Sequence, residues 1–177
     1  DVRIIGPRKV KAFLQGQKTD ANDALAIAVA ASQPGMVFSQ LKSEDQQRMQ
    51  SIESSRKFIS KELLSLTNHM RAALYEYGIT TRRGQKGFKQ LVVDVLDDHI
   101  LGFPQALKSV LRILWERFCQ TLEQLDGIEK QRAQLIKQSE PCQRLKEMEG
   151  VGDVCASLLF ANLGNGSSFK NGRQASA

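Results

Sequence analysis

Residues 43–78 read SEDQQRMQSIESSRKFISKELLSLTNHMRAALYEYG, and this stretch decides the fold. Ser43 with Gln46 three residues later is a capping box that begins a helix, and Gly78 is a signal that ends it. Between them, one set of positions alternates steps of three and four residues, as in a heptad seam, with a polar interruption at Arg56. The seam consists of Met49, Ile52, Arg56, Ile59, Leu63, Leu66, Met70, Ala73 and Tyr77.

A second seam with the same spacing lies in the C-terminal half of the chain. Its members are Leu107, Leu111, Leu114, Phe118, Thr121, Leu125, Ile128, Arg132 and Leu135. Two seams, each about 50 Å long at about 1.5 Å per residue, predict an antiparallel coiled-coil hairpin. Between them we expect a basic, glycine-rich linker over residues 80–87 and a shorter helix from about Phe88 to Leu101.

The N-terminal part of the sequence predicts a strand, a short helix and then an apolar helix. Val2 to Ile5 is a short apolar strand that Gly6-Pro7 ends, and residues 8–14 form a short helix. Residues 24–31 are all alanine, leucine, isoleucine or valine, so the helix should pack against something large. A sheet whose other strands the chain lacks or barely supplies is therefore expected, and both chain ends look cut.

Lys18-Thr19-Asp20-Ala21-Asn22-Asp23-Ala24 begins this apolar helix. Asp20 and Asp23 are three residues apart, so both project from one face of the first turn. Thr19 or Asp20 could cap the helix, and acidic side chains there suit the helix dipole. Alternatively, the two carboxylates could hold one hard divalent cation.

The C-terminal part predicts two short helices around a tight turn. Pro141 opens the first helix, and a second runs from Val154 to Leu163. Gly150-Val151-Gly152 between them is typical of a helix-hairpin-helix, in which the free N–H groups of the second helix face a phosphate oxygen. A plain turn between two helices is the alternative. Lys170 and Arg173 follow and add two cations.

The composition is that of an ordinary globular protein with a basic balance. The 177 residues are 41% hydrophobic, 25% charged and 6% aromatic, which suits one helical domain or two small ones. The net charge of +6 favours a polyanionic partner. No apolar run approaches the roughly 18 residues of a membrane span, and no signal peptide is visible, so we expect a cytoplasmic protein without a membrane partner.

The remaining reactive side chains predict no second site. His69 and His99 are isolated and predict solvated or core histidines, and Asp94, Asp97 and Asp98 predict the solvated face of a helix. The cysteines form no C-x-x-C pair and are expected to be small core residues in a reducing compartment. They are Cys119, Cys142 and Cys155.

Five stretches, taken in order, resemble one protein family. They are VKAFLQGQKTDANDA (10–24), SEDQQRMQ (43–50), NHMRAALYEYGI (68–79), RLKEMEGVGDVCASLLFANLG (144–164) and FKNGRQ (169–174). In order and spacing they resemble the DEDD-type transposases of bacterial insertion sequences, which are related to the Piv-type DNA invertases. The combination of KTDANDA with the terminal GVG and FKNGRQ segments is specific.

The resemblance implies a RuvC-like domain of ribonuclease-H type, where four acids (Asp, Glu, Asp, Asp) bind divalent metal and Asp20 and Asp23 match the last two. A coiled-coil insertion and a transposase domain with a nucleophilic serine would follow. The first two acids would lie upstream of Asp1 and the serine beyond Ala177, so Ser176 is not assigned that role. Family members recombine DNA without the usual long target duplication, and some use an element-encoded guide RNA.

We therefore expect a mainly α chain: a RuvC-like α/β remnant at 1–40, a helical coiled-coil region at 41–140 and the start of a helix-hairpin-helix-like transposase domain at 141–177. It would be a fragment of a bacterial DNA transposase or site-specific recombinase, with Asp20 and Asp23 as catalytic ligands of Mg²⁺ that this fragment holds weakly or not at all.

Its partners would be DNA, a guide RNA and a second copy bound through the coiled coil. The alternatives are a non-enzymatic helical scaffold that binds nucleic acid or dimerises, and an inactive pseudogene product. Candidate nucleic-acid contacts are Lys18, Arg82, Arg83, Lys86, Gly150, Val151, Gly152, Lys170 and Arg173.

Overall fold

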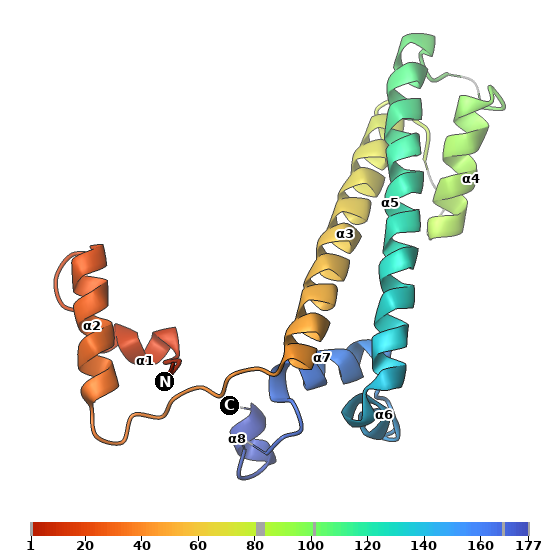
Figure 1. The fold of residues 1–177 in the computed structure, drawn as a ribbon. Helices are drawn as coiled ribbons and strands as arrows, with labels where there is room; N and C mark the ends of the chain where they lie inside the picture. Colours follow the sequence, from red (N-terminus) through yellow and green to blue (C-terminus); the bar gives the residue numbers. More distant parts are fainter. Residues whose placement is uncertain (1, 81–83, 101, 168, 177) are drawn as a thin grey trace.

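The computed structural model describes residues 2–80, 84–100, 102–167 and 169–176, and this part of the chain is mainly helical, as expected. Two long helices, α3 (Glu44–Tyr75) and α5 (Gln105–Gln138), run side by side in opposite directions (Figure 1). The other helices are α1 (Pro7–Lys11), α2 (Asp20–Ser32), α4 (Gln85–Leu96), α6 (Glu140–Lys146), α7 (Asp153–Leu163) and α8 (Gly172–Ser176). None of the described helices is both long enough and apolar enough to span a bilayer.

The start of α3 is set by the capping box that the sequence predicts. The Ser43 hydroxyl accepts a hydrogen bond from the Gln46 N–H (3.2 Å), and the Gln46 side-chain oxygen accepts one from the Ser43 N–H (3.0 Å). Past the other end, Gly78 takes a left-handed conformation with φ of 72°. Both signals act between residues close in sequence, and a cap of this kind stabilises a helix by about 1 kcal/mol.

Two apolar clusters hold the helices together. The larger cluster packs α4 against the far half of the α3–α5 pair, and Phe88 of α4 meets the Phe118 ring edge-on at 5.6 Å between ring centres. The smaller cluster joins the start of α3 and the end of α5 to α6 and α7, through Met49, Ile136 and Phe160. Burying each large side chain stabilises the fold by about 1.5–3 kcal/mol.

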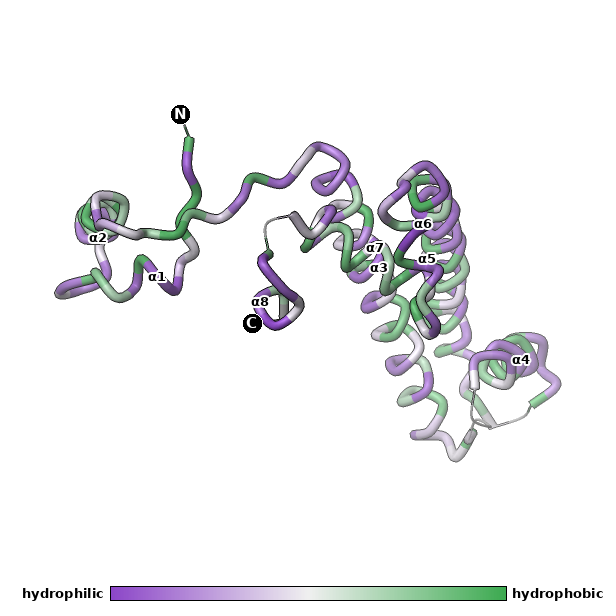
Figure 2. Tube along the Cα trace, turned by 90° about the horizontal axis from the view of Figure 1, so that it is seen from below, coloured by the Kyte–Doolittle hydropathy of each residue, from purple (hydrophilic) through white to green (hydrophobic). Residues whose placement is uncertain are grey.

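The N-terminal helices lie apart from the long pair, as both ribbon and tube views show (Figures 1 and 2). The expected strand at Val2–Ile5 is wrong for the described chain: Ile4 forms one isolated antiparallel bridge with Ser39, because no further strand pairs with it there. The expected burial of α2 on most sides is also wrong. Leu25 is 61% exposed and only Ala26 and Ala30 are buried, since α2 packs mainly on the short α1.

Three smaller expectations change as well. The helix expected at about 88–101 is α4, which starts earlier and stops at Leu96, because Asp98 takes a left-handed conformation with φ of 61° and its carboxylate pairs with the buried Lys108. Tyr77 is exposed rather than part of the seam, and its ring meets Phe103 edge-on at 5.2 Å. Cys155 is exposed, whereas Cys142 is buried.

This difference predicts an order of thiol reactivity. Burial raises the pKa of the Cys142 thiol and of the Cys119 thiol, so at neutral pH each forms less of the reactive thiolate than an ordinary cysteine. We expect iodoacetamide to modify Cys155 first and Cys142 only after unfolding, by mass spectrometry of the peptides over time. Modification of Cys142 as fast as Cys155 in the folded chain would contradict the packing of α6 on α7.

Candidate functional site

The first turn of α2 is held in place by three neighbouring residues. Thr19 is the N-cap, and its hydroxyl accepts a hydrogen bond from the Asn22 N–H at 3.3 Å. The Asn22 side-chain amide donates to the Gln17 carbonyl at 2.7 Å, which ties the preceding loop to the helix. Of the two capping residues that the sequence left open, Thr19 therefore takes the role.

Asp20 and Asp23 lie in this first turn, as the sequence predicts. Asp20 is exposed and Asp23 half-buried, and neither carboxylate forms a hydrogen bond or ion pair with the residues that the structure describes. Since Thr19 caps the helix, both carboxylates remain available to another partner. Their positions one turn apart put them on the same helix face.

The pair suits part of a cation site. Carboxylate oxygens are the ligands that Mg²⁺ prefers, and proteins often hold it through one or two carboxylates with several waters. In the described part of the chain, no three histidine, cysteine, aspartate or glutamate side chains gather closely enough to hold a metal ion. The donor set therefore fits a hard divalent cation, and the pair alone should bind it weakly.

The candidate nucleic-acid contacts that lie among the described residues do not form one continuous site. Lys18 is exposed and directly precedes the acidic turn, whereas Lys86 lies in the first turn of α4, which packs against the long helices away from α2 (Figure 1). Lys170 is exposed beside α8, where its backbone N–H donates to the Gln174 side chain at 2.7 Å, and Arg173 lies on α8. Arg82 and Arg83 lie outside the described residues.

The Gly150-Val151-Gly152 turn connects α6 to α7. Gly150 takes a left-handed conformation with φ of 82°, and Val151 packs against the smaller core cluster. Gly152 caps α7 without a side-chain hydrogen bond, but Asp153 follows it and its carboxylate lies 2.7 Å from the Lys146 ammonium. This carboxylate would repel a phosphate at the start of α7, whereas the Lys146 ammonium beside it would attract one. Both alternatives for the turn therefore stay open.

The structure contains a buried ion network that the sequence did not predict. It comprises Glu53, Arg56, Glu129, Arg132 and Ser157, from α3, α5 and α7. The Glu53 carboxylate accepts hydrogen bonds from the Ser157 hydroxyl (2.5 Å) and the Arg56 Nε (2.9 Å), and Arg132 Nη1 lies 3.6 Å from it. The side chains of Glu53 and Arg132 are only 4% and 8% exposed.

This network is a structural connection between three helices. Arg132 also pairs with Glu129 on its own helix. The only sequence signals were the charged positions Arg56 and Arg132 in mostly apolar seams. Nothing local marks Glu53 or Ser157, because they become buried only where α7 packs on α3.

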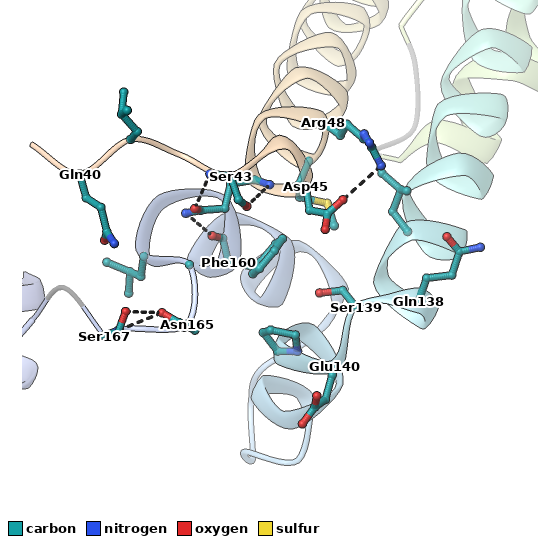
Figure 3. A pocket seen from close by; sticks show the side chains of 17 residues that line it. Gln40, Ser43, Asp45, Arg48, Gln138, Ser139, Glu140, Phe160, Asn165 and Ser167 are labelled. Atoms are coloured by element: carbon teal, nitrogen blue, oxygen red, sulfur yellow. Dashed lines mark hydrogen bonds and ion pairs between the residues drawn. The ribbon is translucent and has the colours of Figure 1, made fainter. Parts of the chain in front are cut away.

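A cavity of about 640 Å³ lies where the start of α3, the end of α5 and the end of α7 meet (Figure 3). Its labelled side chains are mostly amides, hydroxyls and a surface ion pair between Arg48 and Asp45, and Gln46 donates to the Phe160 carbonyl at 3.3 Å. The residues that line it include no histidine or cysteine, and none of the candidate site residues.

Comparisons with known proteins give a consistent result. The family model DEDD_Tnp_IS110, described as a transposase, matches residues 1–79. The chain is 34% identical over 175 residues to the transposase for insertion sequence element IS1111A of Coxiella burnetii, covering 99% of the chain and 48% of that protein. It is 35% identical over 172 residues to the transposase for insertion sequence element IS1328 of Yersinia enterocolitica, covering 97% and 51%.

The chain thus spans about half the length of the curated relatives it matches. No solved structure matches the chain.

Proposed function

This chain belongs to the DEDD family of IS110-type insertion-sequence transposases, and we propose that Asp20 and Asp23 form part of the divalent-cation centre with which the whole protein cuts and joins DNA. The observation that carries the proposal is the first turn of α2. Two carboxylates share one face there, free of hydrogen bonds to the described residues, inside the segment that the family model matches.

The chemistry of the pair supports this role. When bound, a divalent cation acts as a Lewis acid that polarises a phosphodiester and neutralises charge on its oxygens. Asp20 and Asp23 would hold Mg²⁺ through carboxylate oxygens, and Lys18, two residues before Asp20, would hold a nearby phosphate. Thr19 and Asn22 fix the turn from which the carboxylates project.

The rest of the chain would position this centre on DNA. We propose a remnant of a RuvC-like domain at 1–40, a coiled-coil region at 41–140 that pairs two copies, and the start of the transposase domain at 141–177. The division at about residue 40 is supported by the long segment that separates α2 from α3, and the helical region by the apolar seams of α3 and α5, which pack against each other within the chain. DNA would be the substrate, and a structured RNA would guide the protein to it.

A non-enzymatic scaffold or an inactive product is the weaker alternative, because the matched relatives are named as transposases. The two classes differ in what the acidic pair does. A scaffold needs Asp20 and Asp23 only as favourable charges at a helix start, a role that stabilises a helix by about 0.3–1 kcal/mol each.

If Asp20 and Asp23 form part of the cation centre, the whole protein should cleave DNA only with a divalent metal, and this chain alone should not cleave DNA. The 177-residue chain with Mg²⁺ should leave an element-end duplex intact, since two carboxylates leave most of the octahedral coordination to water. A full-length family member should cut the same duplex with Mg²⁺ and stop when EDTA removes the metal, as gel electrophoresis of labelled strands would show. Cleavage by the full-length protein that persists undiminished in EDTA would contradict the proposal.

A further inference from the structure

Positive charge is concentrated before the acidic turn. Residues 1–42 hold six cations and three acids, and residues 43–177 hold nineteen cations and sixteen acids, so the first 42 residues carry half of the net charge of +6. Residues 2–19 contain no acid at all. The five cations of this basic segment are Arg3, Arg8, Lys9, Lys11 and Lys18.

The short helix α1 presents two of these cations to solvent. Arg8 and Lys11 are three residues apart, hence on one face of the helix, and both are exposed. Val10 on the same helix is half-buried, as are Phe13 and Leu14 just after it, so an apolar side packs inward. The neighbouring Lys9 ammonium donates to the Val37 carbonyl at 2.8 Å, which ties α1 to the segment after α2.

Surface cations elsewhere are often neutralised by acids. On the long helices, Arg48 pairs with Glu44 and Asp45, Arg117 pairs with Glu62, and Lys130 pairs with Asp126. Arg8, Lys11 and Lys18 form no ion pair with any residue that the structure describes. The basic segment thus leaves positive charge uncompensated on a surface that hydrogen bonds hold in place at Lys9 and at Gln17.

We propose that Arg8 and Lys11 on α1, together with Lys18, bind phosphates of duplex DNA and so hold the backbone beside the Asp20–Asp23 turn. This inference rests on the proposed function for the identity of the polyanion. Phosphate contacts of this kind carry no sequence information and fix the position of the protein along the duplex. Each contact releases counterions, so binding weakens with salt in proportion to the number of phosphates neutralised.

The test is DNA binding by the 177-residue chain in EDTA, measured by fluorescence anisotropy with a labelled duplex of arbitrary sequence over a range of salt concentrations. The variant is Arg8→Gln/Lys11→Gln. The matched control is Lys57→Gln/Lys61→Gln on α3, which removes the same charge from two exposed lysines without an ion pair among the described residues. Circular dichroism should show both variants as helical as the parent chain.

The α1 variant should bind several-fold more weakly and reduce the slope of log K against log salt by about 1.8, at about 0.9 per phosphate. The control should change the slope by less than half as much. An equal effect of both variants, or none from the α1 variant, overturns the inference. Because EDTA is present and no strand is cut, this result is independent of whether Asp20 and Asp23 are catalytic.

Discussion

Replacing Glu53 with alanine should lower the free energy of unfolding by about 3–5 kcal/mol, a large part of the stability of a domain this size. The loss of stability comes from the polar groups that stay buried once the Glu53 carboxylate is removed. Arg132 stays buried with Glu129 alone, and the Ser157 hydroxyl and Arg56 Nε each lose a hydrogen-bond acceptor. Glu129 alone would then have to serve both Arg56 and Arg132, and a buried charge that loses its partner costs far more than a surface ion pair contributes.

Chemical denaturation followed by far-UV circular dichroism measures this effect. Glu116→Ala on α5 is the matched control, because Glu116 is exposed and forms no ion pair with the described residues, so its loss should change stability by about 0.5 kcal/mol or less. If Glu53→Ala were as stable as Glu116→Ala, Glu53 would not be buried against α5 and α7.

Local signals account for the part of the fold that the sequence predicted. The Ser43–Gln46 capping box, the Gly78 stop and the long periodic stretches each depend on residues within a few turns of one another. The expected strand at Val2–Ile5 depends on pairing partners far along the chain, and the described residues provide a bridge only at Ser39. Periodicity says nothing about partners of this kind.

The same distinction applies to burial of polar groups. Arg56 and Arg132 were visible as interruptions in apolar seams, but Glu53 was not, because its burial depends on Ser157 more than a hundred residues later. For the candidate site, the sequence located Asp20 and Asp23 in a first turn, and the structure adds that Thr19 is the cap. Their role as metal ligands stays a prediction.

Replacing Asp20 and Asp23 should have the largest effect on activity. In a full-length family member, changing the two residues that match this pair to asparagine keeps the shape of each side chain and removes both negative charges. A bound divalent cation stabilises the transition state by several kcal/mol, so losing its ligands should slow recombination at least about a hundredfold. DNA binding in EDTA should persist, because it depends on cations rather than on these acids.

A second acidic pair provides the matched control. Asp94 and Asp97 have the same spacing near the end of α4, and Asp94 accepts a hydrogen bond from the Gln90 side chain at 2.8 Å. Changing the residues that match them to asparagine removes the same charge far from the proposed centre. This variant should recombine DNA at nearly the parent rate.

Recombination of a plasmid carrying the element ends, measured side by side for the parent, the Asp20/Asp23 variant and the Asp94/Asp97 variant, tests the central claim most directly. We expect product from the parent and the Asp94/Asp97 variant, and none from the Asp20/Asp23 variant although it still binds DNA. Full recombination by the Asp20/Asp23 variant would show that these carboxylates serve only the start of α2, and the proposed cation centre would be wrong.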